Sequence, residues 1–155
     1  MRPKIYLETT IASYLTARTS RNILVAAHQQ ITRRWWRRRN RFELFVSQAV
    51  LQEAARGDAV VAARRLAAME GLAVLAVDSA ATELSERLVR SCALPPKAQM
   101  DAVHIAVSVL NGMDYLLTWN CTHIANATLR GKIEETCRDE GLQGPIICTP
   151  EELEA

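Results

Sequence analysis

The chain has 155 residues, of which 49% are hydrophobic and 23% are charged, and its net charge is only +2. These are the values of a globular protein large enough to bury a core, so we expect a single domain over residues 1–155. No apolar run reaches the roughly eighteen residues that cross a bilayer. No signal peptide precedes the first expected strand, so we predict a cytoplasmic protein with no membrane segment.

Short apolar runs alternate with helical patterns along the chain. The runs expected to form strands lie at residues 4–7, 42–46, 72–77, 115–118 and 145–148. Helices are expected at residues 21–39, 48–56, 59–69, 79–92, 99–110 and 129–140, with a short one up to residue 15 after the first strand. Strands that alternate with helices predict an α/β protein with a parallel sheet of about five strands and helices on both faces.

Polar residues that can cap helices follow several of the expected strands. Thr9 or Thr10 is expected to cap the short helix after the first strand, and Ser47 the helix after the second. Thr149 followed by Pro150 and two glutamates has the pattern of one more helix start.

The stretch 99–126 organises the chain. It begins as a helix, which Asn111 and Gly112 end, and continues into a strand buried on both faces. Polar residues follow where that strand ends. Because ligands bind outside the carboxyl ends of parallel strands, Asp101 near the helix start and Asn120 past the strand end are expected to face one crevice.

Four polar residues from four segments are candidates for a common site. Glu8 ends the first strand, Glu53 lies on the helix after the second, and Asp101 and Asn120 belong to the stretch just described. Carboxylate and amide oxygens of this kind are typical ligands of Mg²⁺ or Mn²⁺. The alternative is that Glu53 is a solvated surface residue and Asp101 only a favourable first-turn charge.

The segment 33–41 packs six arginines and two tryptophans into nine residues. Such a patch suits phosphate backbones, and its Trp and Arg planes can stack on bases, which makes Arg37, Arg38 and Arg39 candidate RNA contacts. The other interpretation is a solvated helix end whose tryptophans pack inward, since arginine also favours helix C-termini.

Several common sites are disfavoured. The chain has no GxxxxGK, GxGxxG or GxSxG motif, so nucleotide-binding loops and a serine hydrolase elbow have no support. Its four cysteines are widely spaced without a CxxC pair, and its three histidines lack HxxxH spacing, which makes a zinc site improbable.

Four short segments resemble the signature segments of PIN domains. They are Glu8-Thr9-Thr10-Ile11, residues 47–53 (SQAVLQE), residues 101–106 (DAVHIA) and residues 116–120 (LLTWN), in the same order and spacing as in that family. The similarity covers nearly the whole chain, and the branch that it most resembles is the bacterial toxin type, the VapC-like ribonucleases of toxin–antitoxin systems.

The resemblance implies a three-layer α/β/α fold with a five-stranded parallel sheet. It further implies endonucleolytic cleavage of RNA with Mg²⁺ or Mn²⁺, leaving a 5′-phosphate and a 3′-hydroxyl, and also a homodimer and a cognate antitoxin. Carried over to this sequence, the catalytic residues are Glu8, Glu53, Asp101 and Asn120. The first three would fix the cation, which lowers the pKa of its bound water, and Asn120 would orient a water or the outer shell of the metal.

Two residues depart from the family pattern. Glu8 stands where the family typically has Asp, and Asn120 where it often has Asp. Glu8 moves its carboxylate outward by roughly one bond length, so an octahedral Mg²⁺ ion would have to shift or be reached through water, and Asn120 contributes no charge. We therefore expect one tightly held metal, with any second ion recruited together with RNA.

The same departures favour the main alternative, a catalytically weak or inactive module that binds RNA or a partner protein. A receiver-like phosphoryl-transfer domain has less support.

Further side chains are expected to assist the four catalytic residues. Thr9 and Thr118 can donate hydrogen bonds to the carboxylates or simply cap chain ends. His104, three residues after Asp101 on roughly the same helix face, can orient that carboxylate or touch substrate, or else pack in the core. His123 can contact RNA or serve a local structural role.

Overall fold

The computed structural model describes residues 1–153 and contains one parallel sheet of five strands in the order β3-β2-β1-β4-β5. The strands are β1 (Lys4–Leu7), β2 (Glu43–Ser47), β3 (Ala73–Leu75), β4 (Tyr115–Leu117) and β5 (Ile146–Cys148). The α-helices are α1 (Thr9–Thr16), α2 (Ile23–Trp36), α3 (Gln48–Ala54), α4 (Ala59–Ala68), α5 (Ser79–Ser91), α6 (Gln99–Leu110) and α7 (Ala127–Asp139). Two short 3₁₀ helices are η1 (Arg39–Arg41) and η2 (Pro96–Ala98).

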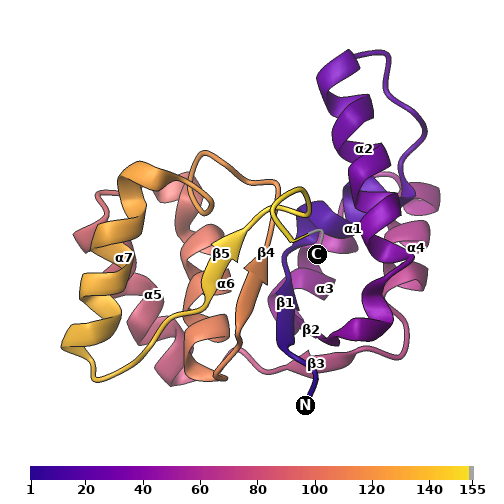
Figure 1. The fold of residues 1–155 in the computed structure, drawn as a ribbon. Coiled ribbons are helices and arrows are strands. Elements are labelled where there is room, and N and C mark those ends of the chain that lie inside the picture. The colour runs from indigo at the N-terminus through magenta and orange to yellow at the C-terminus, as the bar shows by residue number, and fades with distance from the viewer. Residues whose placement is uncertain (154–155) are drawn as a thin grey trace.

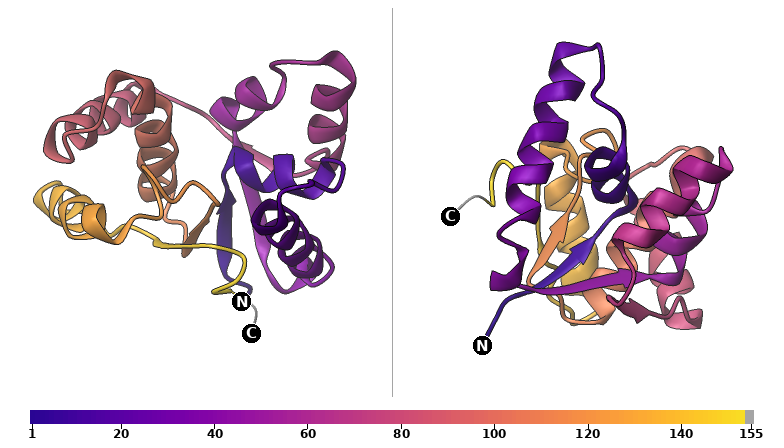
Figure 2. Two further views of the ribbon diagram at one scale, coloured as in Figure 1. Left: turned by 90° about the horizontal axis from the view of Figure 1, so that it is seen from above. Right: turned by 90° about the vertical axis from the view of Figure 1, so that its right-hand side faces the viewer.

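Helices cover both faces of the sheet, as Figures 1 and 2 show. Helices α5, α6 and α7 lie on one side, and α1 to α4 lie on the other. The predicted three-layer α/β/α fold is therefore confirmed. None of the helices in the described residues is long and apolar enough to cross a membrane.

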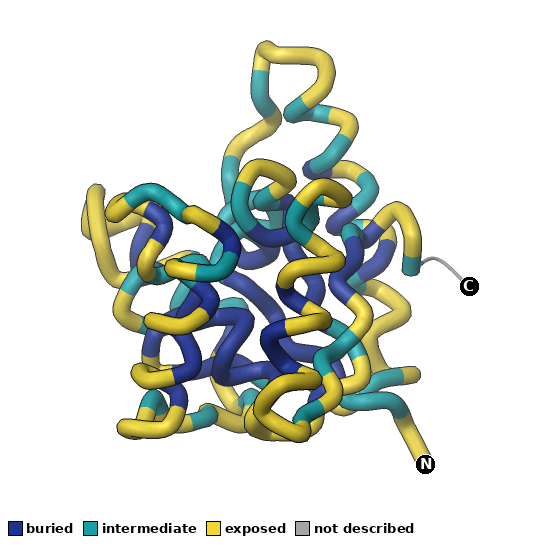
Figure 3. Tube along the Cα trace, turned by 90° about the vertical axis from the view of Figure 1, so that its left-hand side faces the viewer, coloured by how far each residue is buried: buried dark blue, intermediate teal, exposed yellow. Residues whose placement is uncertain are grey.

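The central strand β1 is apolar on both faces because both faces are covered. Ile5, Tyr6 and Leu7 are all buried, as are Leu116 and Leu117 of the neighbouring strand β4. Figure 3 shows this buried interior, with the exposed segments at the periphery. The core thus holds β1 and β4 side by side, and their carboxyl ends share one edge of the molecule.

Helix α2 extends beyond the sheet on the side of its carboxyl ends (Figure 1). Its side-chain cap is Asn22, whose Oδ1 accepts hydrogen bonds from the backbone N–H groups of Leu24 and Val25. The helix ends at Trp36, earlier than the predicted residue 39, and the arginine-rich chain continues as η1. The arginines at residues 37–41 are thus outside α2.

Two of the predicted caps differ in the structure. The N-cap of α1 is Glu8 and neither Thr9 nor Thr10, because the Glu8 carboxylate itself accepts the backbone N–H of Thr10. Near the end of the chain, the predicted helix start at Thr149 is a turn over residues 150–153, and residues 154–155 lie outside the described part. Ser47 caps α3 as predicted.

Candidate metal centre at the carboxyl ends of the strands

Glu8 follows the last residue of β1 and is only 4% exposed. Its Oε1 accepts hydrogen bonds from the hydroxyls of Thr10 and Thr118, both at 2.5 Å. Its Oε2 accepts the backbone N–H of Thr10 at 3.2 Å. The carboxylate is thus held from α1 and from the end of β4, and Oε2 keeps capacity for a further ligand.

The two threonine hydroxyls also join the ends of β1 and β4. Thr10 Oγ1 accepts the backbone N–H of Trp119, and Thr118 Oγ1 accepts that of Asn120, both at 2.9 Å. Because each hydroxyl accepts an N–H in this way, its own hydrogen is free to be donated to Glu8. The residues after β4 are therefore fixed relative to Glu8.

Glu53 reaches the same region from α3. Its Oε1 accepts hydrogen bonds from the Thr9 hydroxyl at 2.6 Å and from His104 Nε2 at 2.5 Å. Its second oxygen hydrogen-bonds to none of the described residues, and 24% of the side chain is exposed. Glu53 is therefore the more accessible of the two glutamates, and one of its oxygens is available to a ligand.

His104 lies in α6 and is completely buried. Its Nδ1 is 2.7 Å from the hydroxyl of Tyr6, which is in turn 2.7 Å from Ser47 Oγ. Because a carboxylate can only accept, Nε2 carries a hydrogen and donates it to Glu53. A buried chain of hydrogen bonds thus runs from β2 through β1 and α6 to Glu53.

The environment of this chain of hydrogen bonds shifts two pKa values. Burial would raise the pKa of Glu53, but the hydrogen bond and charge interaction with His104, helped by Thr9, bring it below its ordinary value of 4.5. Burial raises the pKa of Tyr6 far above its ordinary value, so its phenol keeps its proton. Glu53 is therefore ionised at neutral pH and Tyr6 is a permanent donor.

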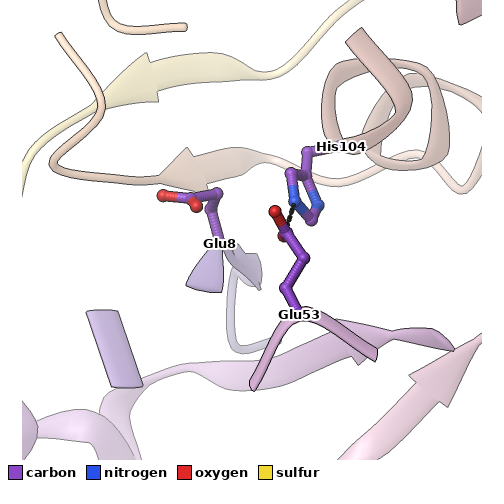
Figure 4. A group of neighbouring side chains, drawn as sticks. All are labelled: Glu8, Glu53 and His104. Atoms are coloured by element: carbon purple, nitrogen blue, oxygen red, sulfur yellow. Dashed lines mark hydrogen bonds and ion pairs between the residues drawn. The ribbon is translucent and has the colours of Figure 1, made fainter. Parts of the chain in front are cut away.

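Glu8, Glu53 and His104 form the glutamate–histidine cluster (Figure 4), in which one donor atom of each residue lies within 4.8 Å of the others. Two carboxylates with an oxygen to spare fit a hard divalent cation such as Mg²⁺ or Mn²⁺, which takes a few carboxylates plus water and phosphate. The imidazole Nε2 is committed to Glu53. The cluster therefore suits a cation held by the glutamates, with His104 holding Glu53 in position.

Asp101 is not brought into this cluster, since no group of described residues that includes it meets the same separation. Its Oδ2 lies 3.1 Å from Nδ1 of His123, which stands in the loop after β4. Asn120 organises that loop, because its Oδ1 accepts the backbone N–H groups of Thr122 and His123 at 3.3 Å and 3.0 Å. Of the four residues expected to converge, Glu8 and Glu53 belong to the cluster, whereas Asp101 on α6 and Asn120 both interact with the loop after β4.

The arginine-rich segment is exposed, but its tryptophans are not available for stacking. Trp35 is buried, and the Arg39 guanidinium covers Trp36 at 4.5 Å from the ring centre. Arg37, Arg38 and Arg39 are exposed. The tryptophans thus pack inward, and the exposed arginines leave positive charge on the surface of this segment, so their contact with RNA stays a prediction.

Three residues of the site were not predicted to belong to it: Thr10, which holds Glu8, and the pair Tyr6 and Ser47. Tyr6 and Ser47 connect His104 to the sheet, and each lies near the end of a buried strand. The available signal was a hydroxyl within an otherwise apolar run, because a buried hydroxyl must find a partner.

No protein-family model and no curated protein sequence matches the chain. Several solved structures resemble it, including the following two. The Mycobacterium tuberculosis toxin VapC20, described as cleaving the sarcin-ricin loop, has 16% identity and a TM-score of 0.61, covering 77% of this chain and 92% of its own. The VapBC2 complex of Rickettsia felis, bound to a DNA fragment from its promoter, has 12% identity and a TM-score of 0.60, covering 94% and 98%.

These likenesses define the fold of the chain. It is the α/β/α fold of VapC-type PIN domains, and the resemblance predicted from the sequence is confirmed at this level.

Proposed function

We propose that this protein is a divalent-metal-dependent endoribonuclease of the VapC type, which hydrolyses phosphodiester bonds of RNA. The observation that carries the proposal is the pairing of Glu8 and Glu53, each with an oxygen to spare, at the carboxyl ends of the strands. This is the place where α/β sheets bind ligands. The fold shared with a toxin that cleaves the sarcin-ricin loop supports the same activity.

Glu8 and Glu53 would hold one Mg²⁺ or Mn²⁺ ion, with Asp101 as the third carboxylate. Such an ion, when bound, polarises a phosphate and lowers the pKa of its water. Thr10 and Thr118 keep Glu8 in place, and Thr9 and His104 keep Glu53 ionised and oriented. These residues supply positioning that needs no rearrangement during the reaction.

The rim of the site would handle the RNA. Asn120 holds the loop that carries His123, and we propose that His123 contacts the RNA there. The exposed Arg37, Arg38 and Arg39 would attract the phosphate backbone by charge.

The partners follow from the same proposal. The fold is shared with a VapBC complex, which supports a cognate antitoxin as the regulator of the proposed toxin. A homodimer and action in the cytoplasm belong to the same proposal, since both are what the family resemblance implies.

The test is an assay of purified protein on a pool of structured RNAs in Mg²⁺, in Mn²⁺ and in EDTA, with any bound antitoxin removed. We expect cuts with 5′-phosphate ends in the metals and none in EDTA. Glu53→Gln should abolish the cuts, and Glu86→Gln, the same change at an exposed position of α5, should leave them unchanged. Cuts that persist in EDTA or in Glu53→Gln would contradict the proposal.

A second candidate is a module that binds RNA or a partner without cutting. One observation favours it: Oε1 of buried Glu8 already accepts two hydroxyls, and Oδ1 of Asn120 two backbone N–H groups, so much of their ligand capacity is used. Well-folded protein that binds RNA but yields no cuts in either metal would support this candidate over the nuclease.

A further inference from the structure

Three aromatic rings from distant parts of the chain form a nearly parallel group, which we call the aromatic platform. Tyr14 lies on α1, His28 on α2, and Trp119 two residues past the end of β4. The ring centres of His28 and Trp119 are 4.0 Å apart with an angle of 11° between the planes. Tyr14 lies 6.1 Å from Trp119 and 6.3 Å from His28, at 18° and 20°, so its ring stands beside the stacked pair.

Trp119 connects the platform to Glu8. Its indole N–H donates to Thr32 Oγ1 at 2.7 Å, and its backbone N–H donates to Thr10 Oγ1 at 2.9 Å. The same Thr10 hydroxyl donates to Glu8 at 2.5 Å. One threonine side chain thus separates the backbone of the platform from the glutamate–histidine cluster, and the orientation of the buried indole is fixed.

The other two rings are only partly covered. Tyr14 and His28 are half-buried, and neither the Tyr14 hydroxyl nor a ring nitrogen of His28 hydrogen-bonds to any residue in the described part of the chain. By contrast, the hydroxyl of Tyr6 and both ring nitrogens of His104 are all engaged. Packing within the protein therefore leaves the polar edges of Tyr14 and His28 open to a ligand.

We propose that the aromatic platform binds one unpaired nucleobase of the RNA, next to the phosphate presented to the glutamate–histidine cluster. This deepens the proposed function and rests on it. Proteins commonly bind splayed-out bases of single strands and loops on aromatic faces, and such stacking tolerates any base because every base has a flat face. Trp35 and Trp36 cannot serve this purpose, since one is buried and Arg39 covers the other.

The experiment measures binding apart from cleavage. Fluorescence anisotropy follows a labelled single-stranded RNA oligonucleotide as it binds the whole protein in EDTA. Tyr14→Ala and His28→Ala should each weaken binding about tenfold, because one stacking partner is lost. Tyr14→Phe, which keeps the ring, and Gln30→Ala, an exposed position on the same helix as His28, should leave affinity within about twofold.

A series of oligonucleotides with one abasic nucleotide each completes the test. Wild-type protein should lose about tenfold in affinity when one particular base is missing, and Tyr14→Ala should be insensitive to that same loss, because the two deletions remove one interaction. If His28→Ala does not fold, Tyr14→Ala and the wild-type series still decide. Equal affinity of folded Tyr14→Ala and wild type, or no position-dependent loss in the wild type, would overturn the platform.

The two proposals fail separately. Metal-dependent cuts together with unchanged binding by Tyr14→Ala would remove the platform and keep the ribonuclease. Base-dependent binding without cuts in any metal would remove the ribonuclease and keep the base site. Folded wild-type protein with no affinity for RNA would overturn the platform.

Discussion

Two carboxylate–histidine pairs lie near the carboxyl ends of the strands in the described part of the chain, and they differ in their surroundings. In the inner pair, Glu53 Oε1 lies 2.5 Å from His104 Nε2, the imidazole is completely buried, and its Nδ1 hydrogen-bonds with the Tyr6 hydroxyl. In the outer pair, Asp101 and His123 are 3.1 Å apart and their side chains are 17% and 19% exposed. The second ring nitrogen of His123 bonds to none of the described residues.

The difference separates a fixed pair from one that can exchange partners. Every polar atom of His104 is satisfied inside the protein, so moving it would leave buried groups without hydrogen bonds. His123 is partly exposed and bonds through one ring nitrogen only, so it and Asp101 lose little if one of them turns towards an ion or RNA. We therefore propose that His104 positions the metal-binding Glu53, and that Asp101 and His123 can each turn to contact a ligand directly.

Apart from Glu53→Gln, the largest effect on cleavage is expected from the carboxylate of the outer pair, Asp101. Asp101→Asn should lower RNA cleavage at least about 100-fold while the fold stays intact, because a charge at the site is lost without a change of shape. His123→Ala should lower it far less. Cleavage rates in Mg²⁺ and Mn²⁺, with circular dichroism as the folding control, provide the measurement. Retained turnover in Asp101→Asn would remove this carboxylate from the site.

For the stability of the fold, the inner pair is expected to matter more than the outer pair. His104→Ala should lower the free energy of unfolding by about 2–4 kcal/mol, since Glu53 and the buried Tyr6 hydroxyl each lose one hydrogen bond and a cavity is created. His123→Ala, at a partly exposed position, should cost within about 0.5 kcal/mol. Urea unfolding of both variants compares the pairs directly. Similar losses in the two variants would end the distinction between a fixed and an adaptable pair.

A smaller effect is expected from the arginines, which lie outside both pairs. Replacing Arg37, Arg38 and Arg39 by Ala should weaken RNA binding. It should also lower the slope of log affinity against log salt concentration by about 2, because each phosphate contact to a single strand contributes roughly 0.7 to that slope. Affinity for Mn²⁺ in calorimetry should not change. An unchanged salt slope would support the alternative interpretation, in which the segment is a solvated surface that does not contact RNA.

The smallest effect is expected from acid. Because the folded-state pKa of Glu53 is lowered, its ionised form stabilises the fold at neutral pH, and this stabilisation is lost as the pH falls below the ordinary value of 4.5 towards the folded-state pKa. Glu53→Gln should therefore show a flatter loss of stability than wild type below that pH. Unfolding free energies measured between pH 6 and pH 3 make the comparison. Parallel curves would mean that the inner pair does not hold Glu53 ionised.

The fold could be predicted because the signals were local. Continuous apolar runs marked the five strands, and glycine or proline marked most ends of the elements between them. The cap of α1 was missed because a glutamate is an unusual N-cap. Here Thr118, far along the chain, holds the carboxylate where it can also accept the Thr10 N–H. Only tertiary structure supplies that support.

The arrangement of the candidate site was less predictable for a geometric reason. Asp101 and His104 are three residues apart, which leaves about 60° between their side chains around the helix. That angle is enough to send one towards His123 and the other towards Glu53. Sequence spacing identified the shared helix face but not the partners, because these come from two other segments whose distance depends on packing.

The order of strands in the sheet has a consequence for how the protein is made. Ile5 of β1 pairs with Leu44 on one side and with Tyr115 on the other, and Glu8 and Thr118 are 110 residues apart. Closing so long a loop costs entropy that local contacts do not repay, so β4 is expected to join β1 late in folding. A growing polypeptide can pair β1, β2 and β3 long before it contains Thr118. The environment of Glu8 is then completed among the last events of biogenesis, which delays the proposed activity until the sheet is whole.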